Sequence, residues 1–168
     1  MTDAVNVEIE MEEDTQKGRF LTFILEKETY GIEIKYVTEI IGIQAITVLP
    51  ELPDYIQGII NLRGKIIPVM DVRLRFKKEF MEYNDRTCII VIETKECSIG
   101  LIVDSVAEVL SIPDADMVEP PRLHTNQVNR YIKNIGKVGS DVKLLLDCFK
   151  LLSEDEMQEV SGILEENQ

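Results

Sequence analysis

The sequence predicts an all-β protein made of two pseudo-symmetric β-subdomains, followed by a short C-terminal helix. Three observations lead to this prediction. Isoleucine and valine dominate the apolar runs, glycine and proline recur between those runs, and the second half of the chain repeats the first. β-branched side chains fit a pleated sheet, and antiparallel strands separated by frequent turns are typical of sandwiches and closed barrels.

The first strands are expected to follow one another along the chain. Residues 20–25 form an apolar run, a turn follows at 26–28, and residues 30–34 return as a second strand. Residues 37–46 alternate loosely between apolar and polar side chains, which predicts a third strand. Two prolines place residues 49–53 in a loop, because proline interrupts both helices and ladders.

A β-hairpin with a basic tip is the best-defined local element. Residues 56–62 and 66–70 are apolar runs, and Arg63-Gly64-Lys65 joins them with a glycine suited to a tight turn. Pro68 lies inside the second run, so that strand is expected at a sheet edge or beside a bulge. Asp71 follows and is expected to cap a short helical turn.

A sequence repeat supports the division into two subdomains. A shift of 69 residues aligns residues 30–34 with 99–103 and residues 37–41 with 106–110. Further along, a shift of 76 residues aligns Tyr55-Ile56 with Tyr131-Ile132 and Asp71-Val72 with Asp147-Cys148. The change of shift predicts a seven-residue insertion in the second copy, within the loop 113–127. Chance alignment is the alternative, but glycine, glutamate, tyrosine and aspartate coincide as well as apolar residues.

The negative charge is concentrated at the two ends of the chain. Of the net charge of −13, residues 1–18 contribute −5 and residues 153–168 contribute −6, which leaves −2 for residues 19–152. Residues 1–18 are expected to form an acidic flexible tail, because they lack large apolar groups. The near-neutral body offers no basic surface of the kind that binds nucleic acid or anionic membranes.

Residues 153–168 are expected to form an acidic C-terminal helix. Ser153 followed by Glu156 is a capping box, in which each residue bonds the backbone N–H of the other. The apolar residues that follow fall on one helix face, which is predicted to pack on the β-body: Met157, Val160 and Leu164.

The sequence offers no recognisable site for catalysis, a metal or a cofactor. His124 is the single histidine, which leaves no partner for a histidine-based triad or a multi-histidine metal site. No glycine-rich phosphate-binding motif is present, and Asp114 and Asp116 lie in a loop without a companion base. We therefore expect a protein that is not an enzyme and needs no cofactor.

Cysteine usage and the start of the chain favour a soluble, cytoplasmic protein. Cys88, Cys97 and Cys148 are dispersed and odd in number, so reduced thiols are expected rather than a Cys88–Cys97 bridge. The acidic start differs from a signal peptide, and no apolar run approaches the roughly 20 residues that span a bilayer.

Two places on the predicted fold are candidate binding surfaces. Arg63 lies at the hairpin tip beside Asn61 and Gly64, where it is either an ordinary solvated arginine or an interaction hot spot. Val37 and Val106 are equivalent in the repeat. They are either core residues or the two walls of a cleft between the subdomains.

The sequence resembles the CheW-type coupling proteins of bacterial chemotaxis over about residues 19–152. The residues that carry the resemblance are Tyr30-Gly31-Ile32-Glu33-Ile34, Val37-x-Glu39-Ile40, Gly58-x-x-Asn61-Leu62-Arg63-Gly64, Pro68-Val69-x-Asp71-Val72-Arg73 and Gly100-x-x-Val103-Asp104-x-Val106. The resemblance implies two intertwined five-stranded, SH3-like barrels. It also implies a non-catalytic adaptor, monomeric alone, that joins the regulatory domain of the CheA kinase to the cytoplasmic tips of chemoreceptors.

The same resemblance implies roles for particular residues. A kinase- or receptor-binding surface is implied for Glu39, Gly58, Asn61, Arg63 and Gly64. A groove that takes the receptor's helical hairpin is implied for Leu21, Ile34, Val37, Ile40 and Val106. Docking of a helix against apolar side chains is a known recognition mode. The resemblance assigns no role to the loop 113–127 or to the acidic ends.

Two alternatives remain at the level of sequence. An OB-like nucleic-acid module would need a basic groove with stacking aromatics, which the thinly spread Phe and Tyr residues do not suggest. A CheV-type protein or a free-standing kinase regulatory domain shares the same motifs. A CheV-type protein would carry a receiver domain after the barrels, and the short segment after Leu152 is expected to leave no room for one.

Overall fold

The structure is a computed structural model that describes residues 16–94, 97–121 and 130–166. The predicted tail therefore lies almost wholly outside the described residues, as does His124. The strands are β1 (Arg19–Leu25), β2 (Glu28–Glu33), β3 (Val37–Gly42), β4 (Ile56–Leu62), β5 (Lys65–Asp71), β6 (Cys88–Glu93), β7 (Ser98–Val103), β8 (Ser105–Ser111), β9 (Met117–Val118), β10 (Ile132–Val138) and β11 (Asp141–Leu146). The helices are η1 (Ile34–Tyr36), α2 (Val72–Arg75), η2 (Asp114–Asp116), α3 (Cys148–Leu151) and α4 (Glu154–Glu166).

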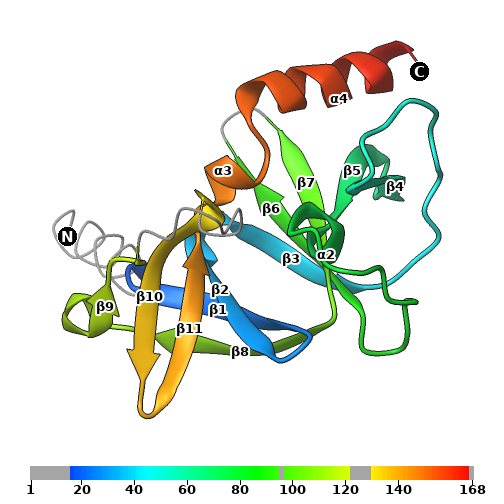
Figure 1. Ribbon diagram of the computed structural model, residues 1–168. Coiled ribbons are helices and arrows are strands. Elements are labelled where there is room, and N and C mark those ends of the chain that lie inside the picture. Colours follow the sequence, from blue (N-terminus) through cyan, green and yellow to red (C-terminus); the bar gives the residue numbers. More distant parts are fainter. Residues whose placement is uncertain (1–15, 95–96, 122–129, 167–168) are drawn as a thin grey trace, which may run out of the picture.

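The strands form two sheets that exchange strands between the halves of the chain. One sheet has the order β8-β1-β2-β11-β10-β9 and the other has the order β3-β6-β7-β5-β4. Each sheet therefore combines two strands from one half with three or more from the other. Figure 1 shows this exchange, with the blue strands β1 and β2 beside the yellow and orange strands β10 and β11. The predicted all-β class with a short C-terminal helix is confirmed.

The repeat is visible in the pairing of individual residues. Gly31 lies opposite Leu145 where β2 meets β11 in parallel, and Gly100 lies opposite Val69 where β7 meets β5 in parallel. A Cβ atom on Gly31 would lie 2.9 Å from Cδ2 of Leu145, and one on Gly100 would lie 2.9 Å from Cγ1 of Val69. Both glycines are required by the same close approach of strands, which confirms the alignment of the halves.

The sixth strand of the larger sheet has a counterpart in the smaller one. Val118 of β9 pairs with Ile135 of β10, and Thr47 forms an isolated antiparallel bridge with Ile59 of β4. Ile59 and Ile135 are equivalent by the shift of 76 residues, so each sheet is extended at the same place. The predicted insertion in the loop 113–127 contains η2 and β9, and residues 122–129 lie outside the described part of the chain.

The halves share one main hydrophobic core. A row of aromatic rings runs through it, formed by Phe23, Tyr30, Phe76 and Tyr131 with successive centroids 5.7, 5.4 and 5.3 Å apart. Smaller clusters lie around Ile89 and Val91 in one sheet and around Phe20, Ile112 and Leu145 in the other. Because the main core draws on both halves, neither is expected to fold without the other.

Two sequence predictions for the first half were wrong in detail. The strand expected over 37–46 ends at Gly42, because the chain then leaves β6 so that Thr47 can reach β4. Pro68 does not place its strand at an edge, since β5 lies between β7 and β4. The parallel ladder with β7 begins at Val69, one residue after the proline. A bulge does occur in the paired strand β4, between Ile56 and Gly58.

The capping predictions are confirmed. The backbone N–H of Ser153 donates to Glu156 at 3.1 Å, and that of Glu156 donates to Oγ of Ser153 at 3.2 Å. Asp71 accepts a hydrogen bond from the N–H of Leu74 at 3.4 Å and so caps α2. In α4, Val160 is buried and Met157 packs against the main core, whereas the side chain of Leu164 lies outside the described ones.

The cysteines and helices give two further results. Cys88, Cys97 and Cys148 are thiols, and burial raises the pKa of Cys148 to about 12. Cys97 Sγ lies 3.7 Å from Sδ of Met157 on α4.

Within the described ranges, no helix has both the length and the apolar character needed to cross a bilayer.

Candidate partner-binding surface

The tip of the β4–β5 hairpin is a two-residue turn that projects Arg63. Leu62 pairs with Lys65, and the residues between them have φ angles of 54° at Arg63 and 86° at Gly64. Two consecutive positive φ angles define the type I′ turn that suits the twist of a hairpin. The side-chain oxygen of Asn61 accepts a hydrogen bond from the N–H of Gly64 at 2.8 Å, so the sequence Asn-Leu-Arg-Gly stabilises its own turn.

Arg63 forms a paired hydrogen bond with Glu39. Nη1 and Nη2 of Arg63 lie 3.0 and 2.9 Å from the two carboxylate oxygens of Glu39. Glu39 lies on β3 and Arg63 follows β4, so the pair joins the two outer strands of the five-stranded sheet. The Arg63 side chain is 78% exposed. An exposed pair contributes only about 0.2–1 kcal/mol, so its main effect is to orient the guanidinium and the carboxylate.

Gly58 acts beneath this surface rather than on it. The residue is buried, has a φ angle of 152° and lies at the bulge of β4. A Cβ atom there would lie 2.2 Å from the backbone oxygen of Thr47. Gly58 is therefore needed for the close pairing of residue 47 with β4, and its place in the structure does not fit a residue that contacts a partner.

The predicted groove residues Val37 and Val106 occupy equivalent positions. Val37 lies opposite Ile92, and Val106 lies opposite Phe23, which is the repeat equivalent of Ile92. Both valines are half-buried and pack against the main core, as does Ile34. Each therefore has one part of its side chain in the core and another part open to solvent.

Ile40 and Leu21 differ sharply from each other in exposure. Ile40 lies on the outer strand β3 and is 43% exposed, so its side chain can be reached by a partner. Leu21 is only 2% exposed, because β1 lies between β8 and β2 and its side chain points into the main core. The structure thus places Leu21 in the core and not along an exposed groove.

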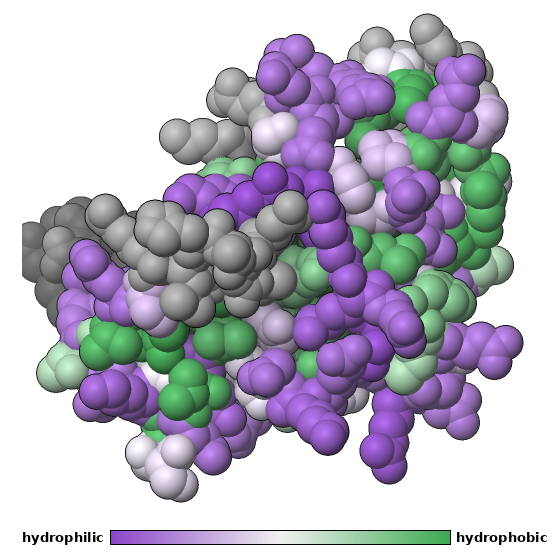
Figure 2. Space-filling view, viewed as in Figure 1, coloured by the Kyte–Doolittle hydropathy of each residue, from purple (hydrophilic) through white to green (hydrophobic). Residues whose placement is uncertain are grey.

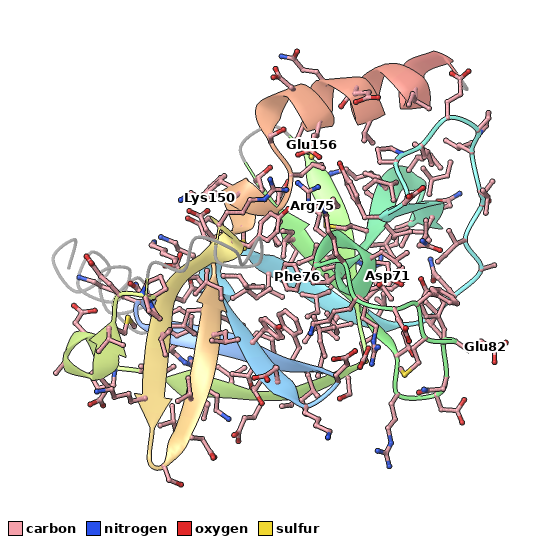
Figure 3. All side chains as sticks on the ribbon, in the orientation of Figure 1. Asp71, Arg75, Phe76, Glu82, Lys150 and Glu156 are labelled. Carbon is pink, nitrogen blue, oxygen red and sulfur yellow. The ribbon has the colours of Figure 1, made fainter. Side chains whose placement is uncertain are left out.

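The sequence prediction missed a cluster centred on Arg75. Its guanidinium lies 4.2 Å from the ring centroid of Tyr55 and 5.1 Å from that of Tyr131, which are equivalent in the repeat. Nη2 donates to Glu156 at 2.8 Å, and Tyr55 also donates to Glu156. Figure 3 shows Arg75 and Glu156 facing each other where α2 approaches the start of α4. The repeated tyrosines were a visible signal, but nothing in the sequence placed Arg75 between them.

The hydrogen bonds of this cluster keep the side chain of Glu156 in its ionised, carboxylate form. Burial acts to raise the pKa of Glu156, but hydrogen bonds from Tyr55, the Ser153 backbone and Arg75 outweigh burial and lower the pKa to about 2. The same carboxylate thus completes the helix cap and attaches α4 to the β-body.

Other motif residues join the two halves. Nε of Arg73 donates to Asp104 at 2.6 Å, and both side chains are largely buried. Burial acts to raise the pKa of Asp104, but the hydrogen bond from Arg73 outweighs it and lowers that pKa. Asp71 accepts a hydrogen bond from Tyr83 at 2.7 Å, and burial raises the pKa of Asp71. Arg73, Asp104 and Asp71, which belong to the motifs that carry the family resemblance, therefore stabilise the fold.

The candidate site combines charged and apolar side chains at the surface. Among the described residues, no group of three or more His, Cys, Asp or Glu side chains is placed to hold a metal ion. Its distinctive features are a charged hairpin tip, where Arg63 pairs with Glu39, and several aliphatic side chains that are half-buried or exposed. Fold and site together define an all-β protein built from two similar halves that exchange strands. Its distinctive residues lie at the surface and between the two halves.

Comparison with known proteins places the chain in a family. Residues 19–156 match the profile of the CheW-like domain, and the chain belongs to that family. It is 35% identical to "Chemotaxis protein CheW" of Klebsiella aerogenes over 150 residues, which cover 89% of this chain and 90% of the relative. It is 30% identical to "Chemotaxis protein CheW" of Treponema pallidum over 159 residues, which cover 92% and 94%.

A solved structure shows the same fold. The scaffolding protein TtCheW from Thermoanaerobacter tengcongensis superposes with a TM-score of 0.76 at 34% sequence identity. The match covers 83% of this chain and 94% of that protein. At this level of identity, the likeness extends beyond the fold to the family, which agrees with the resemblance found in the sequence.

Proposed function

We propose that this chain is a chemotaxis scaffold that couples chemoreceptors to the CheA histidine kinase in the cytoplasm and catalyses no reaction itself. The names of the relatives, "Chemotaxis protein CheW", and the description of the solved neighbour as a scaffolding protein support this proposal. The kinase would bind through its regulatory domain and the receptors through their cytoplasmic tips.

The observation that carries the proposal is the fixed pair of Arg63 and Glu39. An arginine that is 78% exposed normally samples many rotamers, but here both terminal nitrogens are held by one carboxylate. Holding the side chain in advance reduces the entropy that is lost when a partner binds. Arginine is also enriched among residues whose removal strongly weakens interfaces. We infer that the hairpin tip, with Asn61 and Gly64, contacts one of the two partners.

The half-buried aliphatic side chains support a second contact. A helix that docks on a protein normally buries side chains spaced along one face against apolar groups. Ile40 is 43% exposed, and Val37 and Val106 each keep a solvent-accessible part. We infer that these residues, with Ile34, receive the helical hairpin of a receptor tip.

The first test is a pull-down with the purified full chain and its Arg63→Ala variant. The kinase regulatory domain and a receptor-tip fragment are offered separately and together. We expect Arg63→Ala to weaken capture of at least one partner by about tenfold, as loss of a hot-spot arginine typically does. Arg86→Ala is the matched control, because Arg86 is exposed in another turn and its side chain has no ion pair among the described residues. Wild-type capture of both partners by Arg63→Ala would contradict the proposal.

The second test separates the groove from general surface hydrophobicity. Ile40→Ala and Val48→Ala each shorten an exposed aliphatic side chain, since Ile40 is 43% and Val48 78% exposed. Figure 2 shows hydrophobic side chains gathered along the edge formed by the loop that contains Val48. We expect Ile40→Ala to weaken capture of the receptor fragment, and Val48→Ala to leave it unchanged. Equal effects of the two variants would count against a specific groove.

A further inference from the structure

A pocket lies on the α3 side of the molecule, away from the hairpin tip (Figure 3). Its volume is about 390 Å³, and it is lined by Arg75, Arg130, Phe149, Lys150, Ser153 and Glu156. Figure 3 shows Lys150 and Arg75 coming from α3 and α2, with Glu156 above them at the start of α4. Pockets of about 300–1,000 Å³ are large enough to bury several ligand groups at once.

The charge of this pocket is opposite to that of the chain. Acidic residues outnumber basic ones by 31 to 18 overall, but the pocket is lined by three cations and one carboxylate. Of the three cations, Arg75 is the one that the structure shows in contact with that carboxylate, through Nη2. Within the described ranges, Lys150 and Arg130 have no acidic partner, and Arg130 interacts only with Tyr131. Nη1 of Arg75 likewise has no acceptor in the described part of the chain. The pocket therefore has unused capacity for anionic oxygens.

An exposed aromatic ring forms the apolar wall of the pocket. Phe149 is 46% exposed and contacts Tyr36 edge to face, with ring centroids 5.2 Å apart. The repeat equivalent of Phe149 is Arg73, which is buried in its ion pair with Asp104. The first half thus closes this position with a buried ion pair, whereas the second half leaves a phenylalanine at the surface. The difference between the halves leaves Phe149 free to line this pocket, beside Arg75 from the first half.

We propose that this pocket binds an acidic segment of a partner protein. Carboxylates of the segment would pair with Lys150, Arg130 and Nη1 of Arg75, and its aliphatic carbons would lie against Phe149. Glu156 repels anions from the side nearest α4, so the segment binds on the side of Lys150 and Arg130. Arg75 is held in place by two tyrosine rings and the backbone oxygen of Leu151, so it contributes a donor that needs no reordering.

A protein segment fits this site better than two other anions. A nucleic acid carries a negative charge on every nucleotide, so its parts outside the pocket would be repelled by the chain's net charge of −13, whereas a protein segment can carry its acidic residues within the pocket alone. A free phosphate ion has no apolar part and would leave Phe149 without a contact. Among the described residues that line the pocket there is also no glycine, so the lining does not resemble a glycine-rich loop that holds phosphate.

The experiment measures binding of a fluorescein-labelled peptide of repeated Glu-Glu-Leu units to the full chain by fluorescence anisotropy. We expect Arg130→Gln/Lys150→Gln to weaken binding by about tenfold or more, because charge-assisted hydrogen bonds are lost. Lys27→Gln/Lys137→Gln is the matched control. It removes the same charge from two exposed lysines that do not line the pocket, and we expect less than about a twofold change because those charges are screened by salt.

Four results would overturn the proposal. The first is an absence of peptide binding by the wild-type chain, and the second is an equal loss of affinity in the two double variants. The third is displacement of the peptide by an equimolar amount of inorganic phosphate, which would indicate a simple oxyanion site. The fourth is tighter binding of a single-stranded oligonucleotide than of the peptide. None of these measurements uses the kinase or a receptor, so their outcome is independent of the coupling function proposed above.

Discussion

Nε of Arg75 donates a hydrogen bond to the backbone oxygen of Leu151 at 2.7 Å, and Leu151 is the residue equivalent to Arg75 in the second half of the chain. Equivalent residues of a pseudo-symmetric pair can meet only near the axis that relates the halves. At this point the symmetry is broken, since one half has a cation and the other an aliphatic side chain. The cation is one of the groups that attach α4, through its hydrogen bond to Glu156.

Replacing Arg75 with leucine should therefore destabilise the protein. The variant Arg75→Leu makes the halves alike but leaves Glu156 without its cation in a largely covered position. We expect the free energy of unfolding to fall by about 2 kcal/mol, less than for a fully buried pair because Glu156 remains partly hydrated. Urea unfolding monitored by circular dichroism measures this change.

A double-mutant cycle checks the cause. If the cost arises from the unpaired carboxylate, Arg75→Leu/Glu156→Gln should be more stable than the sum of the single effects predicts, by about 1 kcal/mol or more. Simple additivity of the two substitutions would show that Arg75 stabilises the protein through its tyrosine contacts and its hydrogen bond to Leu151, and not through Glu156.

Glu156 also gives the attachment of α4 a defined pH dependence. Folding lowers its pKa from an ordinary value of 4.5 to about 2, so its contribution is complete above pH 4.5 and is lost as the pH falls toward 2. We expect wild type to be more stable than Glu156→Gln at pH 6, and the difference to shrink steadily between pH 4.5 and 2. Urea midpoints of both proteins across this range measure it, and a difference that is constant with pH would contradict it.

Gly58→Ala should be among the most damaging small substitutions in the first half. The added methyl group would lie 2.2 Å from a backbone oxygen, at a φ angle that side chains avoid. We expect a loss of about 3 kcal/mol, from overpacking together with backbone strain. Gly42→Ala is the matched control at the end of β3. Nothing lies within 4 Å of its added methyl group, so its effect should stay within about 0.5 kcal/mol.

The sequence predicted those features that depend on residues close together along the chain or on the repeat itself. The turn at Arg63-Gly64, the cap formed by Ser153 and Glu156, and the alignment of the halves all follow from local patterns. The exchange of strands between the sheets did not follow from them, because a strand's partner is decided by packing and not by its own side chains. For the same reason Leu21 was expected at a groove but lies in the core. Leu21 lies on β1, which is flanked by β8 and β2, and the face to which its side chain points is covered by the main core.

A substitution at the hairpin tip can separate the contribution of Arg63 to stability from its contribution to partner binding. Arg63 has a φ angle of 54°, in a region that costs ordinary side chains about 1–2 kcal/mol, whereas asparagine is favoured there in a type I′ turn. Arg63→Asn also gives up the exposed pair with Glu39, worth about 0.5 kcal/mol. We therefore expect its free energy of unfolding to equal or exceed that of wild type, while capture of a partner falls as in Arg63→Ala. Urea unfolding and the pull-down on the same preparation measure both properties. A loss of stability would show that Arg63 serves the turn, and wild-type capture would show that Arg63 is not part of an interface.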